Sequence, residues 1–205
     1  MPTCRLPVSI QTVPIRVANV LVYYPRVEGL TDPTVQEKIN NTIFQQVYAL
    51  LTEQGYGQHP NIEMRGFYEI KTNERGILSL TLSNYAYIPR HAHGLTIIKS
   101  LTLDVQTGKV YELKELFKPN SAYVQRISDI IRKQIKKRDL PLLGEFKSIR
   151  PDQDFYMADK ALVVYFQLYE ITPYYVGLPM FPISVYDLQD ILDENGPLGK
   201  MLPSE

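Results

Sequence analysis

Apolar residues recur at every fourth position between residues 35 and 51, the spacing of one face of an α-helix. The members of this stripe are Val35, Ile39, Ile43, Val47 and Leu51. The helix is expected to begin at Asp32 and Pro33, because a carboxylate caps a first turn well and proline suits the first helical position. Gly55 is expected to end it.

A second amphipathic helix is predicted over residues 120–138. Its apolar face consists of Tyr123, Ile127, Ile130, Ile131 and Ile135. Its last turns carry the cations Arg132, Lys133, Lys136, Lys137 and Arg138. Such a run is either a nucleic-acid patch or a solvated face that complements the negative C-terminal end of the helix. Because 22 basic residues balance 22 acidic ones, we favour the second interpretation and expect no nucleic-acid partner.

Alternation of apolar and polar positions predicts half-buried β-strands elsewhere in the chain. In residues 77–88 three leucines at every second position share one face, and serine and threonine share the other. Residues 95–105 repeat the pattern. Further strands are predicted at residues 13–24 and 64–72, in a hairpin over 154–166, and after a turn at 106–109 leading into Val110–Leu113.

Strands mixed with two main helices predict an α+β fold, an antiparallel sheet with both helices packed on one face. A short C-terminal helix is expected at residues 184–193. We divide the 205 residues into an N-terminal strand–helix module (1–62), a main domain (63–196) and a tail (197–205). The first two are expected to pack as one compact unit.

Composition narrows the class of protein. Apolar residues make up 44% of the chain, enough for a folded core, yet no run approaches the roughly 20 apolar residues of a membrane span. Cys4 is the single cysteine, so no internal disulfide forms. The N-terminus has no basic segment followed by an apolar one, which predicts a cytoplasmic protein, or an extracellular one if a leader has been lost.

An ordered set of motifs connects the chain to a known family. In chain order they are Ser79–Tyr87, Ala92–Gly94, Leu101–Phe117, Asp154–Tyr156, Val164–Phe166 and Tyr169–Gly177. They resemble the extracellular domain of anti-sigma-V factors (the RsiV-like domain), which also precedes the catalytic domain of some peptidoglycan deacetylases. Val22–Gly29 and Val35–Asn40 resemble the small module that usually comes before this domain.

The resemblance implies a non-catalytic binding or sensor module of a bacterial cell. In anti-sigma-V factors the domain binds lysozyme, so the partner it implies is a lysozyme-like protein or a cell-wall glycan. It supplies no catalytic residues and no cofactor, and it leaves the oligomeric state open. A structural or oligomerising role is a further alternative.

The segment Arg90–Gly94 is the first candidate contact surface, because it places Arg90, His91 and His93 between two strands. Two imidazoles can bind one metal, but zinc needs a third ligand, and the spacing does not require His59 or a carboxylate to supply it. We therefore predict a structural loop or a partner contact, and no metal site.

The second candidate is the loop from Glu170 to Pro182, which three prolines stiffen. Its apolar side chains are Tyr174, Tyr175, Met180 and Phe181. Exposed aromatic residues are effective anchors for a partner, although the same residues also suit a core. The loop is expected to form a binding rim together with residues 88–95.

Glycan hydrolysis is the alternative function. It requires two carboxylates on either side of the scissile bond. The strand and loop carboxylates that could converge are Glu69, Asp104, Asp154 and Glu170. The chain has no Gly-x-Ser-x-Gly elbow and no phosphate-binding glycine loop, so we predict that it is not an enzyme.

Overall fold

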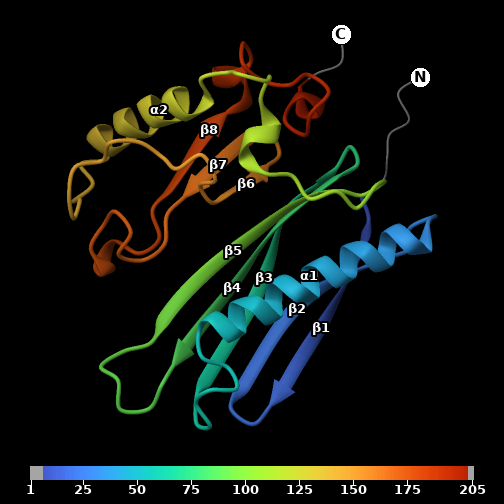
Figure 1. Ribbon diagram of the computed structural model, residues 1–205, viewed down its shortest axis with the longest axis vertical. Helices are drawn as coiled ribbons and strands as arrows, with labels where there is room; N and C mark the ends of the chain where they lie inside the picture. Colours follow the sequence, from blue (N-terminus) through green and yellow to red (C-terminus); the bar gives the residue numbers. More distant parts are fainter. Residues whose placement is uncertain (1–6, 203–205) are drawn as a thin grey trace. The chain divides into compact units, whose positions relative to one another are not determined.

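Two β-sheets, each with its own helix, take the place of the single sheet that the sequence predicted (Figure 1). The computed structural model describes residues 7–202, and Cys4 lies outside them. The chain divides into two units, Met1–Val110 and Tyr111–Glu205, here called unit 1 and unit 2. The α+β class is confirmed, but the placement of both helices on one sheet is wrong.

Unit 1 holds a five-stranded sheet in the order β1-β2-β3-β4-β5. Its elements are β1 (Ser9–Val17), β2 (Val20–Glu28), α1 (Pro33–Glu53), β3 (Glu63–Glu74), β4 (Ile77–Tyr87) and β5 (Leu95–Asp104). The single strand predicted at residues 13–24 is in fact a hairpin, whose turn places Ala18 at a φ of +45°. The division predicted between residues 62 and 63 falls inside this unit, just before β3.

The sheet is mixed and not antiparallel, because β2 and β3 run parallel. Their ladder is short, pairing Val20 with Met64, Leu21 with Arg65 and Val22 with Gly66. Parallel neighbours need a long crossover, and α1 provides it. Glycine is required at position 66, since a Cβ there would lie 2.7 Å from Val22 Cγ1 and 2.9 Å from Asn84 Oδ1.

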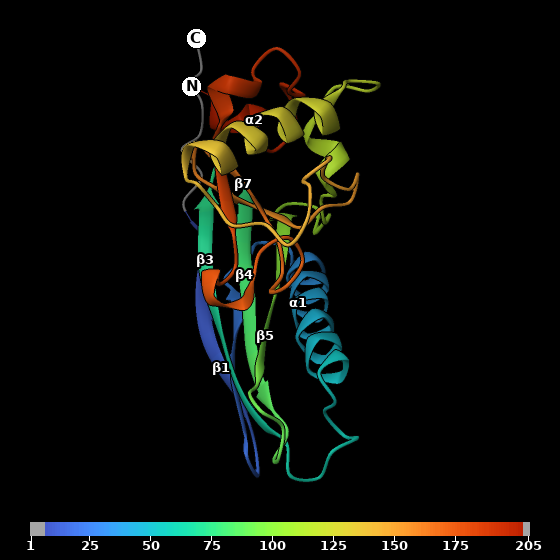
Figure 2. The ribbon, with the colours of Figure 1, turned by 90° about the vertical axis from the view of Figure 1, so that its left-hand side faces the viewer.

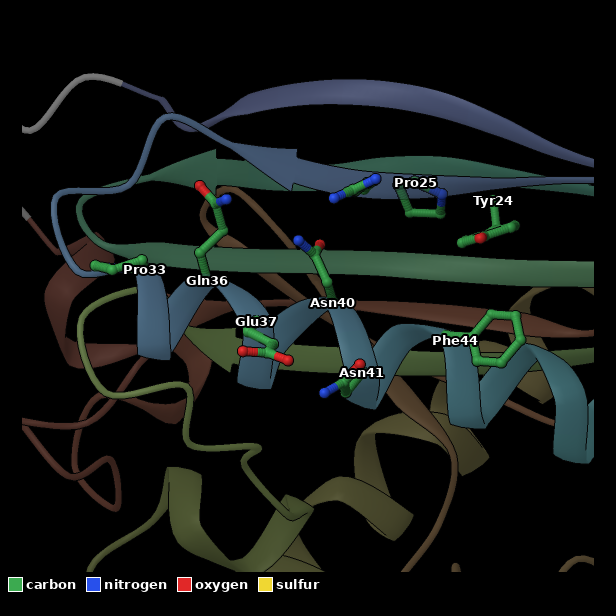
Figure 3. A pocket seen from close by; sticks show the side chains of 9 residues that line it. Tyr24, Pro25, Pro33, Gln36, Glu37, Asn40, Asn41 and Phe44 are labelled. Carbon is green, nitrogen blue, oxygen red and sulfur yellow. The ribbon is translucent and has the colours of Figure 1, made fainter.

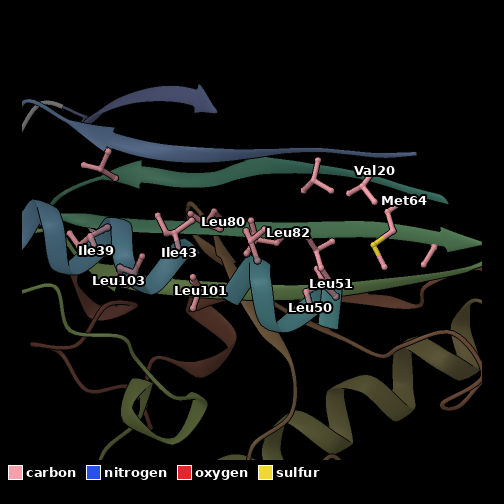
Figure 4. Close-up of a cluster of buried hydrophobic side chains, with 14 of the residues drawn as sticks. Val20, Ile39, Ile43, Leu50, Leu51, Met64, Leu80, Leu82, Leu101 and Leu103 are labelled. Atoms are coloured by element: carbon pink, nitrogen blue, oxygen red, sulfur yellow. The ribbon is translucent and has the colours of Figure 1, made fainter. Parts of the chain in front are cut away.

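Helix α1 lies along one face of this sheet (Figure 2). The predicted start is confirmed, because the Asp32 carboxylate accepts hydrogen bonds from the N–H groups of Thr34 and Val35 at 2.8 and 3.3 Å. The predicted stripe faces the sheet, with Leu50 added to it. Together with leucines of β4 and β5, it forms the core drawn in Figure 4.

The opposite face of β4 is buried as well, although the sequence predicted a half-buried strand. Ser79, Thr81 and Ser83 retain at most 7% of their exposure. The buried hydroxyl of Ser79 lies 2.9 Å from that of Thr102 on β5, so this polar face is hydrogen-bonded across the two strands.

Asn40 fastens β2 to α1. Its Oδ1 accepts a hydrogen bond from the N–H of Val27 at 2.7 Å, and its Nδ2 donates to the carbonyl of Val27 at 3.0 Å. Val27 is fully buried, so neither backbone group has water as a substitute partner. The neighbouring Asn41 is exposed.

Unit 2 contains α2 (Tyr123–Lys137) and an antiparallel sheet in the order β6-β7-β8. The strands are β6 (Phe155–Ala158), β7 (Ala161–Tyr165) and β8 (Met180–Ser184). Short 3₁₀ turns occur at η1 (Leu113–Leu116), η2 (Tyr174–Val176), η3 (Val185–Leu188) and η4 (Gly199–Met201). The C-terminal helix predicted at residues 184–193 is therefore only the single turn η3, and Val110 forms an isolated bridge to Leu103 in place of a strand.

The basic end of α2 is partly used within unit 2. Arg138 donates to the carbonyl of Met180 at 2.8 Å, and its guanidinium lies 5.3 Å from the centre of the Phe181 ring. Arg132 donates to the carbonyl of Lys147 at 2.8 Å and pairs with Asp129. Two of the five cations, Arg132 and Arg138, therefore have structural contacts within unit 2. Within residues 7–202, no helix has the length and hydrophobicity needed to cross a bilayer.

The substitution Asn40→Ala is expected to lower the free energy of unfolding by about 2 kcal/mol, because it leaves two buried backbone groups of Val27 unpaired. Asn41→Ala is the matched control: the same change on the same helix, with an expected effect within about 0.5 kcal/mol. Urea unfolding followed by circular dichroism measures both. Equal losses in the two variants would show that the bonds to Val27 contribute nothing.

Candidate functional site

Three exposed tyrosines crowd the segment that joins β7 to β8. Residues 167–177, here called the tyrosine loop, leave Tyr169 48%, Tyr174 39% and Tyr175 78% exposed. The rings of Tyr169 and Tyr174 stack, with centroids 5.4 Å apart and planes 27° apart. Large aromatic side chains at this exposure are costly to leave in water, which is why they mark contact surfaces.

The carboxylate of Glu170, within the loop, holds it to neighbouring residues of unit 2. Glu170 Oε2 accepts a hydrogen bond from the N–H of Gln167 at 2.7 Å, and Oε1 accepts from the guanidinium of Arg150 and from Gln153 Nε2. Gln153 is almost fully buried and also donates to the carbonyl of Tyr165 at 3.0 Å, at the end of β7. Burial disfavours the charged guanidinium, but the hydrogen bond and charge of Glu170, together with the charges of Asp154 and Asp152, outweigh it and raise the pKa of Arg150.

The backbone of the loop is restrained on both sides of the tyrosines. Tyr169 has a φ of +65°, a conformation that a bulky residue adopts only where its surroundings enforce it. Pro173 starts the turn η2, in which the N–H groups of Val176 and Gly177 bond the carbonyls of Pro173 and Tyr174 at 3.0 Å. Preformed geometry of this kind lowers the entropy lost when a partner binds.

Met180 and Phe181 belong to β8 and not to the exposed loop. Phe181 is fully buried and packs edge-to-face on Phe166, with ring centres 5.7 Å apart. Met180 is half-buried, and its sulfur lies 3.5 Å from the hydroxyl of Tyr156. The structure thus gives Phe181 a role in the core, while Tyr174 and Tyr175 face solvent.

The segment Arg90–Gly94 lies in unit 1, on the connection from β4 to β5. Arg90, His91 and His93 are exposed, and His93 Nδ1 lies 2.9 Å from the carbonyl of Gly94. Gly94 is packed under the ring of Tyr85, where a Cβ would come within 2.4 Å of the ring. In residues 7–202 no group of three or more His, Cys, Asp or Glu side chains is placed to hold a metal ion.

The four carboxylates considered for glycan hydrolysis are divided between the two units. Asp104 caps a turn by accepting from the N–H groups of Gln106 and Thr107, and Glu69 pairs with Lys71 at 3.0 Å. In unit 2, Gln167 joins the other two, because its N–H donates to Glu170 and its Nε2 donates to Asp154 at 3.1 Å. All four carboxylates therefore have structural partners.

Tyr169 is the member of this site that the sequence interpretation missed. It stands at the head of the motif Tyr169–Gly177, so the family resemblance contained the signal. Its exposure depends on the positive φ and on the Glu170 contacts, neither of which a pattern of residue types reveals.

Comparison with known proteins identifies the part of the chain that carries the tyrosine loop. Residues 114–186 match the family described as “Protein of unknown function (DUF3298)”. These residues form a DUF3298 domain. The match lies wholly within unit 2 and includes the whole tyrosine loop.

Two curated proteins of Bacillus subtilis are distant relatives. The anti-sigma-V factor RsiV is 27% identical over 191 residues, which cover 85% of this chain and 66% of RsiV. The peptidoglycan-N-acetylmuramic acid deacetylase PdaC is 25% identical over 139 residues, covering 64% of this chain and 30% of PdaC. The chain thus spans less than two thirds of either relative, and the resemblance to the RsiV-like domain is confirmed.

Two solved structures share the fold. A DUF3298 family protein from Pseudomonas aeruginosa superposes with a TM-score of 0.71 at 14% identity, covering 97% of this chain and 98% of the other. A member of the same family from Bacteroides fragilis gives a TM-score of 0.71 at 13% identity, covering 95% and 97%. At this identity the likeness extends to the fold alone. The cytoplasmic location inferred from the sequence stays a prediction.

The substitution Glu170→Ala is expected to release the tyrosine loop, because it removes the acceptor of three hydrogen bonds. Amide hydrogen exchange at Gln167 and Val176 should become about tenfold faster, in line with the loss of one charge-assisted bond. Glu145→Ala, at an exposed position of unit 2, is the control and should leave these rates unchanged. Unaltered exchange in Glu170→Ala would mean that the carboxylate does not hold the loop.

Proposed function

We propose that the chain is a non-catalytic binding module that captures a protein partner through the tyrosine loop. The observation that carries this proposal is the stacked and exposed pair Tyr169–Tyr174, with Tyr175 beside it in the sequence. Rigid aromatic residues that bury much area and lose little rotamer freedom are the usual anchors of protein interfaces.

The arrangement of the carboxylates supports a role without catalysis. A glycosidase needs one carboxyl group held in its protonated form and a second held apart from it across the scissile bond. Here one carboxylate oxygen of Glu170 is paired with Arg150, and the other accepts a hydrogen bond from the backbone N–H of Gln167. This pattern suits a clamp for a loop better than a general acid.

The family resemblance suggests which partner to test first. Anti-sigma-V factors sense lysozyme through the related domain, so lysozyme is the first candidate for this chain. Arg90, His91 and His93 form a second candidate contact on unit 1, because their side chains are exposed on a loop between two strands.

Lysozyme is expected to bind the purified chain, and replacing both Tyr174 and Tyr175 by alanine should weaken binding by about thirtyfold or more, the loss expected for hot-spot residues. Isothermal titration calorimetry measures both affinities. Tyr186→Ala is the matched control, because this tyrosine is 50% exposed on the same unit but lies outside the loop.

The two parts of this proposal fail separately. An absence of heat with lysozyme would remove lysozyme as the partner. Full binding by the variant that lacks Tyr174 and Tyr175 would instead show that the tyrosine loop is not the contact surface, whichever protein is bound.

A further inference from the structure

A groove runs between β2 and α1 in unit 1, and none of its lining residues belongs to the tyrosine loop (Figure 3). It is open to solvent and has a volume of about 440 Å³, within the range of small-molecule sites. The groove lies just beyond Val22, where the ladder between β2 and β3 ends. The residues of its lining that matter here are Tyr24, Arg26, Gln36, Glu37, Asn41 and Phe44.

One end of the groove is aromatic (Figure 3). The rings of Tyr24 on β2 and Phe44 on α1 lie 5.9 Å apart at 56°, and Phe44 is 44% exposed. One turn further along α1, Tyr48 stacks on Phe44 at 6.4 Å and is 53% exposed. Aromatic faces therefore continue along the helix beyond the groove.

The rest of the groove presents polar side chains whose hydrogen-bonding groups are wholly or partly unused within residues 7–202. Arg26, Glu37 and Asn41 form no hydrogen bond or ion pair there. Gln36 uses its Oε1 to accept from the N–H of Leu30 at 3.0 Å, which leaves both protons of its Nε2 available. Figure 3 shows Gln36 and Asn40 pointing from α1 towards β2. The side-chain amide of Asn40 is already occupied by its two hydrogen bonds to Val27.

The walls are held at a fixed separation, so the groove is a preformed feature of unit 1. The two bonds between Asn40 and Val27 join its sides in the middle. The buried side chains of Ile39 and Ile43, on the neighbouring face of α1, pack into the core beneath. A ligand would therefore meet a frame of β2 and α1 that is already formed, and only the exposed side chains of Arg26, Glu37 and Asn41 would have to be ordered.

This combination of groups selects a neutral, hydroxyl-rich ring. A pyranose has C–H faces that stack on the electron-rich faces of aromatic rings, and its neighbouring hydroxyls pair with planar amide, guanidinium and carboxylate groups. The charges of Arg26 and Glu37 cancel, so the lining offers no net attraction to phosphates or other anions. An apolar peptide would leave the polar groups unpaired in the contact.

We propose that the groove between β2 and α1 is a saccharide-binding site, in which Tyr24 and Phe44 stack on a sugar ring and Arg26, Gln36, Glu37 and Asn41 bind its hydroxyls. The site goes beyond the proposed function, because it takes a different class of ligand on the other unit. A chain that carries both sites binds a protein through unit 2 and a glycan through unit 1.

The test uses the full chain labelled with ¹⁵N and titrated with maltotriose, cellotriose and chitotriose, followed by amide chemical shifts. At least one saccharide should give saturable shifts at Tyr24, Arg26 and residues 36–44, with a Kd on the order of 1 mM, typical of a shallow site. Phe44→Ala should weaken binding by about tenfold, the loss of one ring contact. Phe67→Ala, which changes a 54% exposed phenylalanine on β3 outside the groove, should bind as the unmodified chain does.

Three outcomes would overturn the saccharide site. No saturable shift in the groove with any of the three sugars would do so, as would equal affinity of Phe44→Ala and the unmodified chain. Groove shifts that follow protein concentration and not sugar concentration would show that a second copy of the chain occupies the surface. None of these results bears on lysozyme binding, so the two proposals fail independently.

Discussion

The short parallel pairing of β2 with β3 is the contact on which unit 1 depends. It joins the N-terminal hairpin to the other three strands, and it forms only because α1 carries the chain back to the start of the sheet. Two requirements follow from it. Residue 66 must lack a side chain where Val22 and Asn84 converge, and Asn40 must hold the far end of β2 against the helix. The groove beside Tyr24 lies along the part of β2 that follows Val22, the last residue of this ladder.

Features encoded locally were predictable from the sequence. Helix α1 could be predicted because its apolar stripe, its Asp32 cap and its proline all lie within a few residues of one another. The turn between β1 and β2 could not be predicted, because Ala18 adopts a positive φ without the glycine or asparagine–glycine pair that normally marks a hairpin. The parallel pairing of β2 with β3 could not be predicted either, since alternation shows that a strand is half-buried but not which strand lies beside it.

The candidate site divides in the same way. Prolines and tyrosines drew attention to the loop before β8, but residue types alone could not separate Tyr175, which faces solvent, from Phe181, which lies in the core. Nor could they show that Glu170 binds Arg150 from twenty positions earlier and thereby sets the loop. Tertiary contacts of this kind depend on how β6 and β7 bring separate segments together.

The crossover through α1 also governs the order in which unit 1 assembles. The β1–β2 hairpin and the meander of β3, β4 and β5 each pair between neighbours in sequence and therefore close quickly. On the ribosome the hairpin is made first, and the edge of β2 stays unpaired until β3 has been synthesised. Pro25 in that strand has no N–H to offer to a foreign strand, and it lies in the part of β2 beyond the three pairs that β3 later covers. A proline that takes no part in the finished ladder thus removes one backbone donor from the edge that the growing chain exposes.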